Sequence, residues 1–221
     1  MDYSWKFSVV WDYRDVFFQG AVVTGQLAFY SIAIGLSLGL LFGMARASSI
    51  VVLRWPTAVF IEFFRSTPTL VQLVWIYYAL PIITGRQLGA MEAVIIGLGF
   101  HTAAYVAEIF RGGINSIDKG QGDAAKALGM SYLQSMKRII LPQAVRRMVP
   151  PFMNEFANLM KLTTLASVLA VYELMHESQN LISHTFRPLE IYTALAVGFF
   201  LLIFPIIYAS QRLEKYWRVR G

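Results

Sequence analysis

Residues 16–45 read VFFQGAVVTGQLAFYSIAIGLSLGLLFGMA, a run that contains no Asp, Glu, Lys or Arg. A bilayer core about 30 Å thick is crossed by roughly 20 apolar residues in a helix. Lipid offers no hydrogen-bond partner to the backbone, so only helices and closed barrels cross it, and this run lacks the alternation of a barrel strand. The run therefore predicts a membrane-spanning helix.

The rest of the chain repeats this pattern. The sequence is 57% hydrophobic and only 14% charged, whereas soluble domains have about 25% charged residues. Residues 66–85 and 191–211 are also free of charged residues, and the weaker segments Glu92–Arg111 and Met148–Tyr172 carry few. We expect an all-α, polytopic membrane protein with about five transmembrane helices, and residues 1–221 forming one transmembrane domain.

Local signals refine the first two predicted spans. Gly35, Gly39 and Gly43 are four residues apart, and small residues at this spacing allow two membrane helices to approach closely. The same stretch contains a Gly-x-Ser-x-Gly pattern, but a nucleophile elbow requires a strand-to-helix turn, so helix packing is the better interpretation. Pro68 lacks a backbone donor and is expected to kink the second span.

Two charged pairs and a glycine pair lie near span ends. Glu62 and Arg65 are three residues apart, as are Glu108 and Arg111, so each pair can form an ion pair along a helix. The glycine pair at 112–113 is expected to end the third span.

Most of the 19 Lys and Arg residues fall in the loops on one side of the predicted spans, between spans one and two, between three and four, and after five. The positive-inside rule places that side in the cytoplasm. The N-terminus is then periplasmic and the C-terminus cytoplasmic. Because the basic residues flank spans, the net charge of +6 indicates topology control and not nucleic-acid binding.

Residues 123–142 read DAAKALGMSYLQSMKRIILP, a polar and basic stretch between apolar segments. The acid at Asp123, the pair Ala124 and Ala125, Gly129 and the Ile-x-Leu-Pro ending resemble the EAA loop of bacterial ABC-importer permeases, with Asp123 where the family usually has Glu. The resemblance implies that the cytoplasmic loop of about 112–146 forms a coupling helix that docks on an ATP-binding subunit. The residues alone leave open an amphipathic helix lying on the lipid surface.

Further motifs resemble the polar-amino-acid branch of these permeases, the histidine, glutamine and glutamate type. They are RSTPTLVQ at 65–72, YVAEIFRGGINSIDKGQ at 105–121 and ILPQAVRRMVPP at 140–151. The resemblance implies the type I ABC importer permease fold in a bacterial inner membrane. It also implies two ATP-binding subunits, a second permease chain, identical or homologous, and a periplasmic amino-acid-binding protein.

The chain itself has no Gly-x-x-x-x-Gly-Lys-[Ser/Thr] segment, the loop that cradles ATP phosphates. We therefore expect a transport subunit and not an enzyme, with no cofactor of its own, and with ATP and Mg²⁺ bound by the partner ATPase.

The fourth predicted span carries the most unusual side chains. Asn154, Asn158 and Lys161 lie at i, i+4 and i+7 on one helix stripe, with Glu155 beside it. Ionisable groups inside a bilayer are costly and usually face a wet cavity or a partner. We interpret these four residues as lining a substrate pathway; the alternatives are packing against neighbouring helices, or Lys161 extending to the interface.

The family commonly has NEF followed by LKD-x-S here, and Leu162 stands where the Asp is usual. In relatives that carry basic amino acids, the resemblance assigns that acid a contact with the cationic side chain. Its absence favours glutamate or aspartate as substrate, with glutamine or basic amino acids as alternatives.

Other classes of protein find less support. His176, Glu177 and His184 match no zinc-ligand spacing, so no metal site is expected, and His101 is interpreted as a hydrogen-bonding residue between helices. A membrane-embedded enzyme would need a nucleophile or metal constellation that the sequence does not assemble. A non-transporting scaffold would have no use for an EAA-type loop.

Overall fold

The structure is a computed structural model that describes residues 3–48 and 50–218. Within these residues every regular element is a helix, which agrees with the predicted fold class. The helices are α1 (Ser8–Asp12), α2 (Arg14–Ala47), α3 (Val51–Ser66), α4 (Thr69–Tyr78), α5 (Leu80–Thr84), α6 (Ala90–Asn115), α7 (Lys119–Ala127), α8 (Tyr132–Ser135), a π-helical turn at Met136–Ile140, α9 (Leu141–Leu162), a 3₁₀ helix at Thr163–Leu169, α10 (Leu174–Thr185) and α11 (Pro188–Arg218).

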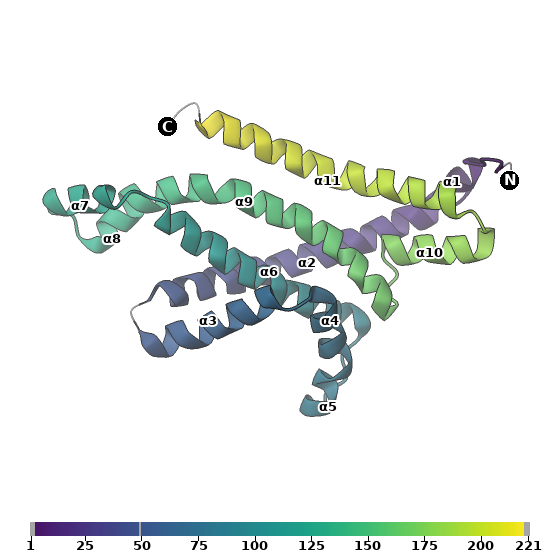
Figure 1. The fold of residues 1–221 in the computed structure, drawn as a ribbon, viewed down its shortest axis with the longest axis horizontal. Helices are drawn as coiled ribbons and strands as arrows, with labels where there is room; N and C mark the ends of the chain where they lie inside the picture. The colour runs from purple at the N-terminus through teal and green to yellow at the C-terminus, as the bar shows by residue number, and fades with distance from the viewer. Residues whose placement is uncertain (1–2, 49, 219–221) are drawn as a thin grey trace.

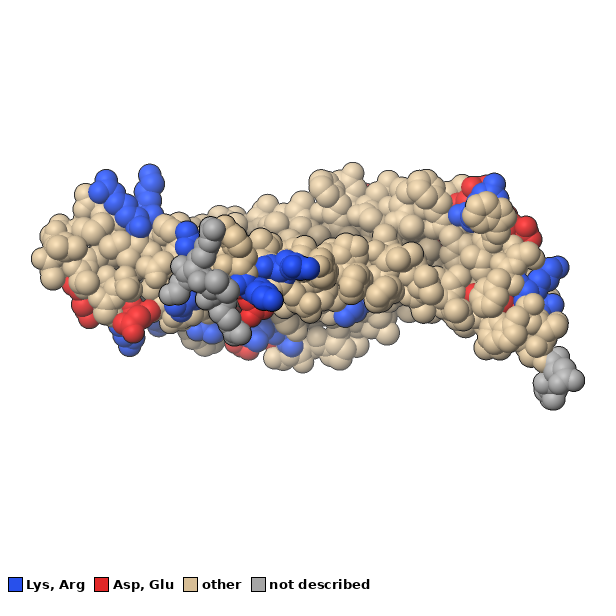
Figure 2. Space-filling model, turned by 90° about the horizontal axis from the view of Figure 1, so that it is seen from above, with Lys and Arg blue, Asp and Glu red and all other residues tan. Residues whose placement is uncertain are grey.

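The long helices run along the long axis of the molecule (Figure 1). The N-terminal segment, α1 and α10 lie at one end, and α7, α8 and the end of α11 lie at the other. Figure 2 shows that, on the face in view, most Lys and Arg side chains gather towards the end with α7 and α8, while the middle is largely uncharged. This distribution is that of a membrane protein with one basic side.

Three described helices are long and apolar enough to span a membrane: α2, α6 and α11. A fourth candidate is a broken span, in which Val51–Ser66 and Thr69–Thr84 meet at 109°. The second span, predicted at 66–85 with a kink at Pro68, therefore begins earlier and bends more sharply than expected, because the charged residues of α3 hid its first helix from a search for uncharged runs. Helix α9 is absent from the candidates, since it combines several arginines with Glu155 and Lys161.

The break between α3 and α4 is built by Pro68 and Gln72. Pro68 cannot donate a backbone hydrogen bond, so α3 ends at Ser66 and leaves carbonyl groups unpaired. The buried Gln72 Nε2 donates to the carbonyls of Phe64 (2.9 Å) and Thr67 (3.0 Å) and to Thr67 Oγ1 (2.7 Å). The kink expected at Pro68 is thus a sharp bend, at which Gln72 binds two carbonyls and the Thr67 hydroxyl donates to a third, that of Phe63.

The glycine stripe of α2 packs against α6, as predicted. A Cβ atom at Gly35 would lie 2.5 Å from Thr102 Cγ2, and one at Gly39 would lie 2.5 Å from Val106 Cβ and 2.8 Å from the Ala103 carbonyl oxygen. Real Cβ atoms do not come this close to backbone. The two helices can therefore adopt this spacing only with glycine at these positions.

Helix α6 does not end at the glycine pair, contrary to the prediction; it continues to Asn115. Gly113 instead allows close packing, because a Cβ there would lie 2.3 Å from Met148 Cγ of α9. Paired glycines in a membrane helix serve helix contact as readily as termination.

Ion pairs join α2, α3 and α6. Glu108 binds Arg111 at 2.7 Å, as expected, and it also lies 3.2 Å from Arg46 and 3.7 Å from Arg65. The pair predicted between Glu62 and Arg65 does not form, because Glu62 binds Arg46 at 3.4 Å instead. Glu62 thus pairs only with another helix, whereas Glu108 pairs both within α6 and with two other helices.

The N-terminal segment is tied to the start of α11. The Tyr3 hydroxyl donates to Glu190 Oε2, and the Lys6 backbone N–H donates to Glu190 Oε1 at 2.9 Å. Arg187 Nη1 donates to the Ser4 carbonyl at 2.7 Å. The hydrogen bond to Glu190 raises the pKa of the Tyr3 hydroxyl above its ordinary value.

Replacing Gly39 with Leu should separate α2 from α6 and destabilise the protein, because overpacking a close contact typically costs about 1–3 kcal/mol. The measurement is the thermal unfolding midpoint in detergent. Gly25→Leu on the same helix is the matched control, since a Cβ at Gly25 meets nothing within 4 Å. Equal midpoints for the two variants would contradict the proposed helix contact.

Candidate functional site

The polar stripe of α9 lies where its spacing predicted. Asn154, Asn158 and Lys161 are exposed on one face of the helix, and Glu155 beside them is buried. At a rise of about 1.5 Å per residue, the three exposed groups are spread over about 10 Å of the helix. This length can accommodate a small polar solute.

Glu155 faces α6 and also lies beside Asn158 of the exposed stripe. Its Oε1 lies 3.9 Å from His101 Nε2, and His101 Nδ1 lies 3.2 Å from Thr69 Oγ1 of α4. Helices α4, α6 and α9 therefore meet at one buried polar centre. His101 makes the hydrogen bond between helices that was expected of it.

Two polar atoms of this centre, His101 Nε2 and Glu155 Oε1, have no hydrogen-bond partner among the described residues. Buried polar atoms are usually paired. Such free atoms are suited to contacts that form when the protein binds a solute or changes conformation.

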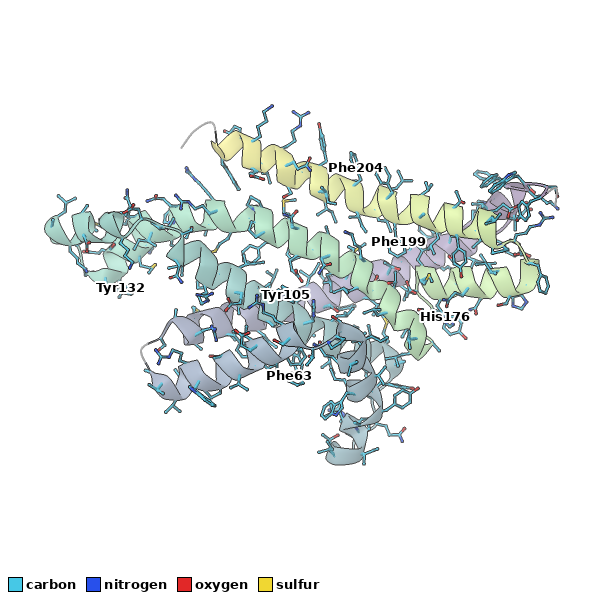
Figure 3. The ribbon with its side chains drawn as sticks, viewed as in Figure 1. Phe63, Tyr105, Tyr132, His176, Phe199 and Phe204 are labelled. Atoms are coloured by element: carbon cyan, nitrogen blue, oxygen red, sulfur yellow. The ribbon has the colours of Figure 1, made fainter. Side chains whose placement is uncertain are left out.

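The polar centre continues along α6 towards α3. The rings of His101 and Tyr105 lie 4.7 Å apart, and the Arg65 guanidinium lies over the Tyr105 ring at 5.7 Å. Figure 3 places Tyr105 near the middle of the molecule, on α6. A row of polar and aromatic side chains thus links the α9 stripe to the ion pairs around Glu108.

A cleft of about 780 Å³ opens between α9 and α11. Asn154 lines it together with Gln143, Arg146, Arg147, Pro150, Pro151, Glu214 and Trp217. One member of the predicted pathway therefore borders a wet, charged space.

The predicted coupling loop is a compact helical hairpin. Asp118 begins α7 by accepting a hydrogen bond from the Gly120 N–H at 2.6 Å. At the other end Gly129 has φ +72°, and the Gly129 and Met130 N–H groups donate to the carbonyls of Lys126 and Ala125. This is a Schellman ending, in which the left-handed residue is usually glycine.

Helix α8 follows directly. Ser131 and Gln134 cap it reciprocally, with the Ser131 N–H bound to Gln134 Oε1 at 2.9 Å and the Gln134 N–H bound to Ser131 Oγ at 3.3 Å. The ends of α7 and α8 are therefore defined by local hydrogen bonds that need no partner protein.

The predicted coupling residues divide into two sets. Asp123 and Ala124 are exposed, and Asp123 lies 3.6 Å from Lys126. Ala125 is fully buried, and Gly129 sets the turn. The first two can touch a partner directly, whereas the other two shape the hairpin.

Three apolar side chains at the tip of the hairpin were missed by the sequence analysis. Leu128, Tyr132 and Leu133 are 79%, 73% and 77% exposed; Figure 3 marks Tyr132 at this end of the molecule. They are exposed at the basic end of the protein. An exposed cluster of apolar side chains is unfavourable in water and typically marks an interaction site. The sequence signal that could have identified them is their position on either side of Gly129, within the predicted coupling loop.

No group of three His, Cys, Asp or Glu residues suited to a metal ion occurs within residues 3–48 and 50–218. His176 packs edge-on against Tyr172 with ring centres 4.8 Å apart.

Known proteins with similar sequences share this organisation. Residues 35–219 match the family described as "Binding-protein-dependent transport system inner membrane component". The chain is 35% identical over 220 residues to the glutamine transport system permease protein of Escherichia coli (strain K12), covering 99% of this chain and 100% of the relative. It is 38% identical over 200 residues to a probable glutamine ABC transporter permease protein of Bacillus subtilis (strain 168), covering 88% and 90%.

Similarity to an arginine transport system permease protein of Bacillus subtilis (strain 168) is 32% identity over 197 residues, covering 89% of this chain and 90% of the relative. Among solved structures, an amino acid ABC transporter crystallised with histidines superposes with a TM-score of 0.91 at 31% identity, over 97% of this chain and 100% of that one. The MetNI methionine ABC transporter in an inward-facing conformation shares the fold at 20% identity and a TM-score of 0.72, over 93% and 97%. The chain therefore belongs to the binding-protein-dependent transport system inner membrane components, as the permease subunit of an amino acid ABC importer and not an enzyme.

Proposed function

We propose that this permease moves a polar amino acid from a periplasmic binding protein to the cytoplasm, by alternating between outward-open and inward-open states driven by ATP in a partner. Two ATP-binding subunits, each holding ATP and Mg²⁺, and a second permease chain complete the assembly. The ATP-driven change acts by shifting the population of the two states. The observation that carries the proposal is the α7–α8 hairpin, with its apolar tip, at one end of the same chain that carries the polar stripe of α9.

In this mechanism the hairpin is the contact with the ATPase. Leu128, Tyr132 and Leu133 form an apolar knob, and the exposed Asp123 and Lys126 stand beside it. An apolar projection entering a groove of a partner is a common mode of helix recognition. The local capping of α7 and α8 keeps the knob preformed, which lowers the entropy lost on docking.

Gly129→Val should abolish substrate-stimulated ATP hydrolysis while leaving membrane insertion intact. The Gly129 φ of +72° costs a non-glycine residue about 1–2 kcal/mol, and more for a β-branched side chain, so the hairpin turn should open. Gly122→Val is the control, because neither site has an atom within 4 Å of an added Cβ and Gly122 has no positive φ. The measurement is ATPase activity of the reconstituted importer with and without its loaded binding protein.

Normal substrate-stimulated ATP hydrolysis by the Gly129 variant would show that the hairpin is not part of the coupling mechanism. Asp123→Glu should keep near-normal stimulation, since the carboxylate is retained at an exposed position.

The orientation follows from the same assignment. With the hairpin in the cytoplasm, the end carrying α1 and α10 is periplasmic and α11 ends in the cytoplasm. This orientation agrees with the basic side chains near α7 and α8 (Figure 2) and with the positive-inside rule. The last residues, 219–221, lie outside the described part of the chain.

A reporter that is active only in the cytoplasm should be active when fused after Gly221 and inactive when fused before Met1. Accessibility of single cysteines to a membrane-impermeant reagent gives an independent measurement, because the sequence has no native cysteine to mask it. Labelling of a cysteine at position 133 from outside intact cells would show that the orientation is the opposite of the one proposed.

For the substrate, we favour a neutral polar amino acid, glutamine first. The stripe offers one exposed cation, Lys161, for the α-carboxylate, and two amides, Asn154 and Asn158, that can bind a side-chain amide. Glu155 is directed towards His101 but is placed to receive the α-amino group when that contact opens. Two relatives are glutamine permeases by name.

Glutamate and aspartate are the second candidates. Leu162 stands where the family usually has an acid, so the pathway has one negative charge fewer to repel them. A side-chain carboxylate would, however, need a further cation, which the stripe does not provide.

Lys161→Met should reduce uptake by at least about tenfold, since a hydrogen bond to a charged group contributes about 1.5–3 kcal/mol. Lys215→Met, at an exposed position near the end of α11, should leave uptake unchanged. Leu162→Asp should raise arginine uptake relative to glutamate by electrostatic attraction. The measurement is competitive uptake of glutamine, glutamate and arginine into vesicles that hold the complete importer and a binding protein accepting all three.

Equal uptake by the wild type and the Lys161 variant would show that the stripe has a structural role and does not bind the substrate. Preference for glutamate over glutamine in the wild type would favour the second candidate.

A further inference from the structure

A basic pocket of about 330 Å³ lies between the end of α2, the start of α3 and the end of α6. It is lined by Arg46, Arg54 and Arg111, with Trp55 and Ala58 completing the wall. Three guanidinium groups around one small pocket repel each other unless anions lie among them. The pocket shares no lining residue with the α9 stripe or the tip of the hairpin, and the proposed transport mechanism does not use it.

The carboxylates nearby only partly neutralise it. Arg46 uses Nε for Glu108 and Nη2 for Glu62, and Arg111 uses Nε and Nη2 for Glu108. Within the described residues, the Nη1 group of each arginine makes no hydrogen bond, and Arg54 forms no ion pair. Each guanidinium carries five donors, so several remain available to an anion.

An apolar groove of about 590 Å³ continues from this pocket along α3. The two share Trp55 and Ala58, and the groove goes on past Val59 and Phe63 to Thr67. Trp55, Val59 and Phe63 are 68%, 52% and 56% exposed, and Figure 3 places Phe63 at the outer side of α3. Only Glu62 adds a charge to this wall.

The dimensions and chemistry of the two spaces match one kind of molecule. From Trp55 to Thr67 the groove follows about 18 Å of helix, and one leaflet of a bilayer core is about 15 Å thick. Trp55 stands at the junction, as tryptophan does at membrane interfaces. The basic pocket sits at the outer edge of this leaflet, where basic pockets between membrane helices bind anionic headgroups.

We propose that this composite site binds an anionic phospholipid of the leaflet on the side of the α7–α8 hairpin. Its phosphate would contact Arg46, Arg54 and Arg111, and one acyl chain would lie along Ala58, Val59 and Phe63. The bound lipid would stabilise the junction of α2, α3 and α6, because its negative charge balances the arginines that Glu62 and Glu108 leave uncompensated.

The test measures lipid binding to the purified complete importer by native mass spectrometry. It is titrated with dioleoylphosphatidylglycerol or dioleoylphosphatidylcholine, which share acyl chains and differ in headgroup charge. The wild type should bind the anionic lipid more tightly. Arg54→Gln should weaken that binding about fivefold, as expected for loss of about 1 kcal/mol per basic residue, and leave phosphatidylcholine binding unchanged.

Arg138→Gln is the matched control, since it removes the same charge from an exposed arginine near the same end of the molecule. Arg54 is the informative position because its replacement breaks none of the ion pairs of Glu62 and Glu108. Ala58→Trp should fill the shared wall and weaken binding of both lipids.

Equal weakening by the Arg54 and Arg138 variants would overturn the proposal, since it would indicate general surface charge. Displacement of phosphatidylglycerol by millimolar inorganic phosphate would indicate a site for free anions instead. Loss of permease pairing in the Ala58 variant with unchanged lipid binding would assign the groove to a second permease chain. The readout needs neither ATP nor an amino acid, so it is independent of the proposed transport function.

Discussion

The close approach of α2 and α6 is the constraint on which the rest of the structure depends. In lipid, apolar side chains gain little by associating with each other, so helices are held by packing and polar contacts. Gly35 and Gly39 bring α2 against Thr102 and Val106 of α6. With that contact fixed, the opposite side of α6 presents His101, Tyr105 and Glu108 to α3, α4 and α9. One helix thus carries the packing contact on one face and the polar row on another.

Features set by local chemistry could be predicted from the sequence. The α2, α6 and α11 spans follow from uncharged length, and the positive φ of Gly129 follows from a glycine ending a short helix. The start of α3 could not be predicted from uncharged runs, since Arg54, Glu62 and Arg65 interrupt its apolar face. The partners of Glu108 were also unpredictable, because Arg46 and Arg65 approach it only after three helices have packed.

The same division applies to the candidate site. The spacing of Asn154, Asn158 and Lys161 placed them on one exposed face without any knowledge of neighbours. The burial of Glu155 against His101 depends on how α6 crosses α9, and the role of Gln72 depends on a bend that the sequence indicates only through Pro68. Position along a helix is encoded locally, whereas the contacts between helices are not.

The bend between α3 and α4 has a consequence for how the chain is made. Gln72 satisfies the carbonyls of Phe64 and Thr67, which lie only eight and five residues before it. The elbow therefore binds these two carbonyls with a side chain of its own segment, before α6 exists. Residues 51–84 therefore enter the bilayer with part of the hydrogen bonding that lipid cannot supply already present in their own segment, and these two carbonyls do not depend on later helices.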